Sequence, residues 1–231
     1  MEYSTRVIEV LPRSKTAVSI RFAKPAGFTY LPGQYMFITL RKGEETLIKH
    51  LTISSSPTEP FLEVTKGLTG HPFANALSAL VPGDEARISG PFGEFIFERE
   101  YERVVFLSGG IGITPLRSMI RNATDRGLST RILLLYSARS EADVLFGIEM
   151  DQMMEKNRNL KVIITLTAPD PGWPGRTGRI DRTLIEREVP DWKQQVFFTS
   201  GPPVMVDAIV AILEELGVQH DHIHQEQFPG Y

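Results

Sequence analysis

Three glycines follow an apolar run in the segment VVFLSGGIGITP: Gly109, Gly110 and Gly112. In a turn that leads from a strand into a helix, glycine lets backbone N–H groups approach a phosphate at the positive helix N-terminus. The spacing resembles G-x-G-x-x-G, except that Pro115 replaces the third glycine at the helix start. The turn therefore predicts a pyrophosphate site. The alternative is a turn that needs glycine only for its backbone angles.

A second turn of the same kind lies in QVFFTSGPPVMVDAIVAIL. Here Ser200, Gly201 and Pro202 separate an apolar run from a helical pattern. Ligands of open parallel sheets bind outside the carboxyl ends of the strands. Two such turns at equivalent places favour a dinucleotide site more strongly than either turn alone.

The segment KHLTISSSP, residues 49 to 57, places a cation and an imidazole before an unusual run of hydroxyl side chains. Its alternating pattern predicts a strand, and its polar end needs an explanation. An edge strand with solvated Ser and Thr residues is the simplest one.

Two further groups of residues suggest metal or sulfur chemistry. His220, His222 and His224 would share one face of a strand, and imidazoles suit zinc or nickel. A metal site normally needs a third or fourth ligand in a set geometry, so we favour a solvated strand end and predict no metal. Met153 and Met154 are better explained by helix packing than by a thioether site.

The composition of the chain excludes several classes of function. The chain has 231 residues, a formal net charge of -3 and no cysteine. Disulfides and cysteine-ligated iron–sulfur clusters are thereby excluded, and the charge gives no reason to expect nucleic acid. Apolar runs are strand-sized, Asp207 interrupts VMVDAIVAIL, and MEYSTRVIEV has no apolar centre. We therefore expect no membrane insertion, no cleavable signal and a cytoplasmic location.

The first part of the chain reads as short strands separated by Pro and Gly. Alternating segments span 4–12, 16–23, 33–41, 47–54, 60–67 and 84–91, which predicts a six-stranded antiparallel β-barrel. A helix should interrupt it over 71–80, where Phe73, Leu77 and Leu80 have helical spacing and Pro72 is a suitable first residue.

The pattern changes near residue 100. Apolar strands at 103–108, 131–137, 160–167 and 195–200 alternate with helical segments at 114–127, 141–157, 182–189 and 202–217. Such alternation predicts a doubly wound parallel sheet with helices on both faces. We place the domain boundary near Glu98 to Tyr101, which gives a barrel domain of residues 1–99 and an α/β domain of residues 100–231.

At this point the chain resembles the ferredoxin–NADP reductase-like flavoproteins over nearly its whole length. KHLTISSSP is similar to the family's R-x-[YF]-[ST] flavin strand, GPFG to its barrel-closing segment and GGIGITP to its nicotinamide-nucleotide turn. SGPPVM resembles the C-G-P-P-x-M segment, and EQFPGY resembles the acidic and aromatic C-terminus.

The resemblance implies that the barrel binds a flavin. Lys49 would take the place of the arginine at the flavin phosphates, Leu51 that of the aromatic beside the isoalloxazine, and Thr52 that of the hydroxyl near flavin N5. The hydroxyls of this strand would serve as partners for a buried, heteroatom-rich ring. Lysine offers a point charge and leucine cannot stack, so binding should be looser and FAD, favoured over FMN, less certain.

The resemblance also implies the remaining site residues. The segment TGHPFANAL would present a helix N-terminus to the pyrophosphate, although His71 there has an equal alternative as a first-turn cap. The implied cofactor-binding set comprises Lys49, His50, Leu51, Thr52, Val64, Lys66, Gly70, His71, Pro72, Phe73, Gly109, Gly110, Gly112, Ile113, Thr114, Ser137, Arg139, Gly201, Pro202, Met205, Phe228 and Tyr231.

The implied reaction follows from alignment of two rings. Hydride would pass from nicotinamide C4 to flavin N5 at roughly 3 to 3.5 Å. Thr52, Ser200 and Glu226 form the implied catalytic set. Ser200 replaces the family's cysteine, which should slow transfer, and Glu226 with Phe228 or Tyr231 would cover the other flavin face.

Nucleotide preference stays open. Ser137 and Arg139 would suit a 2′-phosphate, whereas Glu141 and Asp143 would suit the ribose of NADH. We therefore expect NAD(P)H as the co-substrate.

The resulting hypothesis is an FAD-dependent NAD(P)H oxidoreductase that delivers electrons to a separate one-electron acceptor. That acceptor would be a ferredoxin, a flavodoxin or an oxygenase component, or a small acceptor such as free flavin or ferric iron. The alternative is a flavin-deficient, non-catalytic binding or regulatory subunit with the same fold.

Overall fold

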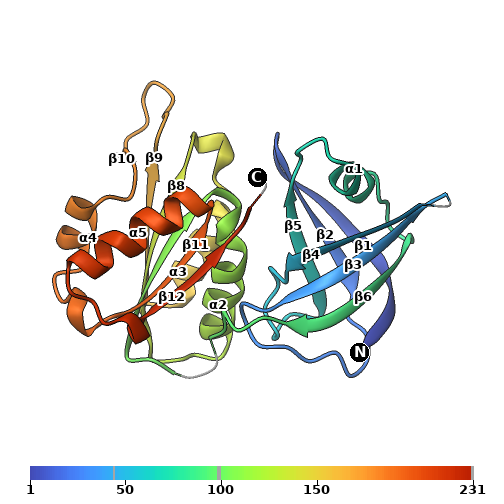
Figure 1. Ribbon diagram of the computed structural model, residues 1–231, viewed down its shortest axis with the longest axis horizontal. Coiled ribbons are helices and arrows are strands. Elements are labelled where there is room, and N and C mark those ends of the chain that lie inside the picture. Colours follow the sequence, from blue (N-terminus) through green and yellow to red (C-terminus); the bar gives the residue numbers. More distant parts are fainter. Residues whose placement is uncertain (44, 98–99, 230–231) are drawn as a thin grey trace.

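The chain folds into two parts, each built around one β-sheet (Figure 1). The computed structural model describes residues 1–43, 45–97 and 100–229. In the N-terminal part, six strands form an antiparallel sheet in the order β4-β3-β6-β1-β2-β5. An isolated bridge between Ile53 and Val64 connects the two outer strands and closes the barrel.

The six barrel strands match the six alternating segments of the sequence. Their bounds are β1 (Glu2–Ser14), β2 (Ala17–Ala23), β3 (Tyr35–Lys42), β4 (Glu45–Thr52), β5 (Phe61–Gly67) and β6 (Glu85–Phe92). Helix α1 (Pro72–Ser78) follows β5 and begins at the proline that the sequence indicated. Side chains such as Ile20, Phe22, Met36 and Ile38 fill the barrel because the inward positions alternate with polar ones.

The C-terminal part is a parallel sheet with the order β10-β9-β8-β7-β11-β12. Its elements are β7 (Arg103–Gly109), α2 (Ile113–Asp125), β8 (Arg131–Ala138), α3 (Gly147–Lys156), β9 (Leu160–Leu166), β10 (Arg176–Thr177), α4 (Arg182–Glu188), β11 (Val196–Gly201), α5 (Pro203–Glu215) and β12 (Ile223–Gln227). The strand order reverses direction between β7 and β11.

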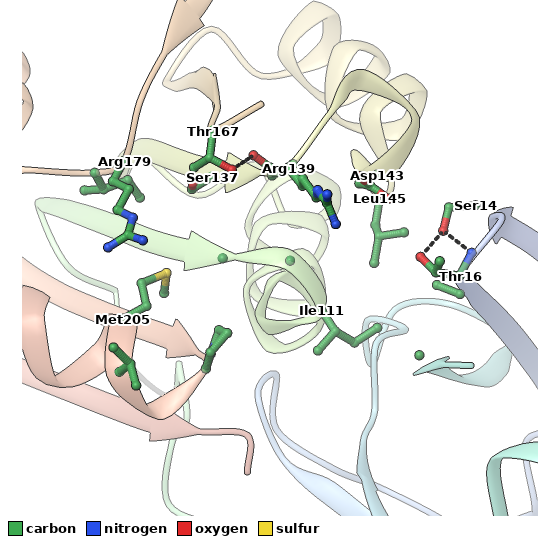
Figure 2. A pocket seen from close by; sticks show the side chains of 18 of the residues that line it. Ser14, Thr16, Ile111, Ser137, Arg139, Asp143, Leu145, Thr167, Arg179 and Met205 are labelled. Atoms are coloured by element: carbon green, nitrogen blue, oxygen red, sulfur yellow. Dashed lines mark hydrogen bonds between the residues drawn. The ribbon is translucent and has the colours of Figure 1, made fainter. Parts of the chain in front are cut away.

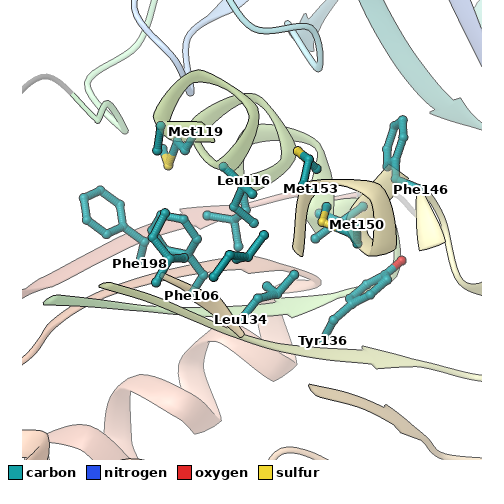
Figure 3. Packing of buried hydrophobic residues seen from close by; sticks show 14 of the residues in the cluster. Phe106, Leu116, Met119, Leu134, Tyr136, Phe146, Met150, Met153 and Phe198 are labelled. Atoms are coloured by element: carbon teal, nitrogen blue, oxygen red, sulfur yellow. The ribbon is translucent and has the colours of Figure 1, made fainter. Parts of the chain in front are cut away.

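Helices cover both faces of this sheet. On one face α2 and α3 pack over Phe106, Leu134 and Tyr136, and Met153 is buried in this cluster with Met154 against it (Figure 3). On the other face α4 and α5 pack over a second apolar cluster. The predicted fold class and the packing role of both methionines are therefore confirmed.

Two local predictions were wrong, and one short strand was missed. The segment 141–157 is not one helix, because Phe146 adopts the left-handed φ of 59° and separates a short turn from α3. The two-residue strand β10 was not predicted. His220 and His222 lie in a 3-10 turn, and only His224 of the three histidines lies in strand β12.

Among the residues that the structure describes, no helix is long and apolar enough to cross a bilayer.

Candidate functional site

The two glycine turns meet at the point where the strand order reverses. The first follows β7 and the second follows β11, and these strands are neighbours in the sheet. A Cβ on Gly112 would lie 2.5 Å from the Cα of Gly201, so only glycine allows the two turns to pack this closely. Ser200 reinforces the contact, since its hydroxyl donates to the carbonyl oxygen of Gly112 at 2.7 Å. Ligands of open α/β sheets bind at this kind of crevice.

A cavity of about 630 Å³ opens beside these turns (Figure 2). From the α/β part it is lined by the ends of β7 and β8, by Pro202 after β11 and by the start of α5. From the barrel it is lined by Ser14, Thr16, Ala17 and Gly67 to Thr69. Six predicted site residues border it: Gly109, Gly110, Ser137, Arg139, Pro202 and Met205. The cavity therefore lies between the two sheets, with walls from both.

Gly110 shapes the mouth of the first turn. Its φ is +54°, and no heavy atom lies within 4 Å of the position a Cβ would occupy. The left-handed backbone thus faces open space beside the cavity, where a phosphate could approach the backbone.

The structure adds cavity residues that the sequence did not single out. Thr167 follows β9, Arg179 follows β10, and Leu145 precedes α3. Figure 2 shows Arg139 and Arg179 on either side of Ser137 and Thr167. The sequence did not indicate Arg179, because the strand before it has only two residues and so shows no alternation of apolar and polar residues.

The flavin strand predicted from the sequence is β4, which ends at Thr52. Thr52 is 5% exposed, and within the described part of the chain its Oγ1 has no hydrogen-bond partner. A buried hydroxyl of this kind normally has a partner, so a ligand atom would complete its bonding.

A pair of lysines lies near the same strand. Burial, together with the charge of Lys49 on β4, lowers the pKa of the buried Lys66 on β5 to about 8. Two adjacent ammonium groups repel each other, and an anion such as a phosphate would relieve that repulsion. The residues present thus fit the phosphates and one ring edge of a flavin nucleotide.

The hydroxyl groups of the three serines after Thr52 do not need a ligand, because they have hydrogen-bond partners within the chain. The Ser54 hydroxyl is bonded to Thr65 at 3.1 Å, and the Ser55 hydroxyl accepts from the backbone N–H of Glu63 at 2.9 Å. The carbonyl oxygens of Ser54 and Ser55 accept from the parallel-sheet part: Arg117 Nη1 donates to Ser54 at 3.1 Å, and Ser118 Oγ donates to Ser55 at 2.6 Å. The polar end of the strand is therefore a buried junction between the two parts, and the solvated-edge explanation is wrong for Ser54, Ser55 and Ser56, which are fully buried.

Other predicted flavin contacts lie around β4 and α1. Leu51, Val64 and Phe73 are buried in the barrel core, and His50 packs its ring near Tyr35 at 5.3 Å. His71 is the N-cap residue of α1 but makes no capping hydrogen bond with its side chain. Gly70 and Pro72 flank it in the turn that leads into the helix. Direct contact of these residues with a cofactor stays a prediction.

The remaining predicted residues belong to α2 and to the last strand. Ile113 and Thr114 begin α2 and are buried. The backbone N–H of Phe228 donates to the carbonyl oxygen of Gly201 at 2.9 Å, so Phe228 lies beside the second turn. Tyr231 lies outside the described residues.

Glu226 on β12 pairs in register with Ser200 on β11. Burial raises the pKa of Glu226 to about 8, and among the described residues its Oε2 has no partner. A carboxyl group of this kind is protonated at neutral pH and can donate a hydrogen bond.

Comparisons with known proteins agree with this geometry. Residues 106–211 match the family model of the oxidoreductase NAD-binding domain. The FAD/NAD-binding domain of a nitric oxide dioxygenase from Vibrio cholerae superposes with a TM-score of 0.87 at 21% identity, covering 97% of this chain and 98% of that one. A ferredoxin NADP⁺ reductase from Neisseria gonorrhoeae, solved with bound FAD and NADP, gives 0.85 at 18% identity and covers 98% of both chains. The chain has the ferredoxin–NADP reductase-like fold that these solved structures share.

A curated protein that is similar in sequence is longer than the chain. The reductase subunit of glycine betaine monooxygenase from Chromohalobacter salexigens is 30% identical over 212 residues, which cover 89% of this chain but 58% of the relative. The likeness therefore covers the two sheets of the ferredoxin–NADP reductase-like fold and leaves the rest of the relative unmatched.

Proposed function

We propose that the chain is an FAD-dependent NAD(P)H oxidoreductase that passes electrons to a separate one-electron acceptor. The observation that carries this proposal is the cavity of about 630 Å³ at the strand-order reversal, walled by the barrel on its other side. The match of residues 106–211 to the oxidoreductase NAD-binding domain and the similarity to a longer reductase subunit support it. The proposal includes a cytoplasmic location and an acceptor that is a ferredoxin, a flavodoxin or an oxygenase component. It also includes a division into a domain of residues 1–99 and a domain of residues 100–231, although residues 98 and 99 lie outside the described part.

The chain's own residues would bind and orient the two cofactors. Lys49 and Lys66 would neutralise the flavin phosphates, and the unpartnered hydroxyl of Thr52 would bond to the ring edge. Gly109 and Gly110 would let the nucleotide pyrophosphate approach the backbone beside α2. When bound, FAD supplies a ring that takes two electrons from a nicotinamide and releases them singly.

The visible spectrum of the purified protein tests this function. We expect a yellow protein, or a colourless one that takes up added FAD, which bleaches anaerobically with NADH or NADPH. A protein that stays colourless with added FAD would contradict the proposal and favour the non-catalytic subunit.

We also propose a preference for NADPH. Arg139 and Arg179 both line the cavity, whereas the Asp143 carboxylate already accepts from the Ser140 hydroxyl at 2.7 Å and from its backbone N–H. An acidic group occupied in this way is a poor partner for a ribose hydroxyl, and two guanidinium groups suit a phosphate.

Replacing Arg179 with Gln should weaken NADPH binding about tenfold, the low end of the effect of one charge-assisted hydrogen bond. NADH binding should change less than twofold. Isothermal titration calorimetry with each nucleotide measures the difference, and Arg158→Gln, which changes an exposed arginine at the end of α3, is the control. An equal loss for both nucleotides would show that Arg179 does not contact the 2′-phosphate.

A further inference from the structure

A buried ionic cluster joins the barrel to the parallel sheet, and the proposed chemistry does not use it. We call it the junction cluster; its members are Arg13, Glu59, Glu63, Arg117 and Glu149. Three of them belong to the barrel part and two to the helices that follow β7 and β8.

Arg117 on α2 is the centre of the cluster. Its side chain is 1% exposed, and all three guanidinium nitrogens donate. Nη2 donates to Glu59 at 2.9 Å, Nε donates to Glu149 at 3.0 Å, and Nη1 donates both to Glu59 and to the carbonyl oxygen of Ser54 at 3.1 Å. One side chain of the α/β part is therefore fixed to the barrel by several bonds.

Glu149 on α3 links Arg117 to a second arginine. Its Oε1 accepts from Arg13 at 2.6 Å while its Oε2 accepts from Arg117. Arg13 in turn donates to both carboxylate oxygens of the fully buried Glu63 on β5 at 3.0 Å. The guanidinium groups of both arginines lie over the ring of Phe146, at 4.4 Å for Arg13 and 5.7 Å for Arg117.

The cluster contacts both halves of the candidate site. On the barrel side, Ser54 follows the predicted flavin residue Thr52 by two positions. On the other side, Phe146 follows Leu145, which lines the nucleotide cavity. Arg117 is bonded to Ser54 and lies 5.7 Å from the ring centroid of Phe146, but it is not among the residues that line the cavity.

From this arrangement we propose that Arg117 is a positioning residue, which sets the Thr52 strand relative to the nucleotide cavity. The proposal rests on the proposed function for its catalytic consequence. Buried ion pairs add little to stability compared with apolar residues of similar volume, so specificity of geometry is the stronger reason for such a cluster. A guanidinium group is needed here because its planar, fixed set of N–H donors can bond two carboxylates and a carbonyl at once, which a lysine ammonium cannot do.

The test compares Arg117→Lys with Arg182→Gln, which removes an exposed ion pair on α4. Hydrogen exchange of the protein without nucleotide is measured at the amides of Ser54 and Leu145, which are bonded to Glu63 and Tyr136. Arg117→Lys should speed exchange at both amides at least tenfold, and Arg182→Gln should leave both unchanged. Faster exchange at only one amide, or at neither, would overturn the proposal.

Stopped-flow reduction of the flavin supplies the catalytic readout. In Arg117→Lys the limiting rate at saturating NADPH should fall at least tenfold while the dissociation constant of NADPH changes less than twofold. An unchanged limiting rate would overturn the positioning role. If the wild-type flavin is not reduced at all, the proposed function fails, and hydrogen exchange still decides whether Arg117 couples the two segments. Glu149→Gln, which keeps the side-chain volume, replaces Arg117→Lys in both measurements if that variant does not fold.

Discussion

Replacing Gly112 with Ala should lower the free energy of unfolding by at least about 3 kcal/mol, the upper part of the range for overpacking. The φ of Gly112 is -59°, so alanine is compatible with its backbone conformation and the loss would be purely steric. The new Cβ would lie 2.5 Å from the Cα of Gly201 and 2.6 Å from the carbonyl carbon of Ser200. These are backbone atoms of the second turn, so a side-chain rotation cannot relieve the overlap.

Chemical denaturation at neutral pH measures this loss. The matched control is Gly110→Ala, two residues away, where the new Cβ meets no atom within 4 Å but φ is +54°. That variant should lose only about 1 kcal/mol for the left-handed conformation, while its nucleotide affinity falls because Gly110 lines the cavity. Equal stability of Gly112→Ala and the wild type would show that the two turns do not need this close contact.

The contrast between these two glycines shows what the sequence could and could not predict. The glycine run correctly predicted a strand-to-helix turn at the ligand edge of a parallel sheet, because that chemistry is local. It could not show that Gly112 is required by the turn after β11, since 88 residues separate the atoms that meet there. The alternative weighed for the run, a need for glycine's backbone angles, fits Gly110 with its φ of +54°, whereas Gly112 with a φ of -59° is required by close packing, which neither explanation named. Ligand approach at this turn stays a prediction.

The run of hydroxyl side chains that begins at the end of β4 was likewise predicted only in part. Its polarity correctly indicated buried groups in need of partners, but the partners of Ser54 and Ser55 come from this chain. Arg117 and Glu149 each look like an ordinary surface charge of an amphipathic helix when read along the sequence. Figure 1 shows α2 on the side of the parallel sheet that faces the barrel. This placement brings Arg117 and Glu149 together as an ion pair in which the Arg117 side chain is 1% exposed.

The alternation of apolar and polar residues predicted all six barrel strands because a period of two is a strong signal over seven or more residues. By contrast, Phe146 breaks a helical pattern for a reason that is not local. Its ring lies beneath Arg13, 133 positions earlier in the chain, and this contact accompanies a left-handed backbone that a phenylalanine rarely adopts.

Stability should fall as the pH rises from about 5 to 9, and Glu226 should account for much of the change. Burial raises the pKa of Glu226 from its ordinary value of 4.5 to about 8, so the native state holds this proton more tightly than the unfolded chain does. The stabilisation is complete below pH 4.5 and is lost as the pH rises through 8. This difference in pKa between the native and the unfolded state corresponds to on the order of 5 kcal/mol at most.

Glu226→Gln removes this dependence because an amide stays neutral throughout the range. We expect the variant to lose the fall in stability between pH 5 and 8 and to exceed the wild type in stability at pH 9. Urea denaturation at pH 5, 7 and 9 measures both profiles, with Glu155→Gln, an exposed residue of α3, as the control that should keep the wild-type slope. If Glu226→Gln lost stability with rising pH as steeply as the wild type, the carboxyl group would have to be ionised and solvated at neutral pH. Its proposed place as a neutral hydrogen-bond donor beside the second glycine turn would then be wrong.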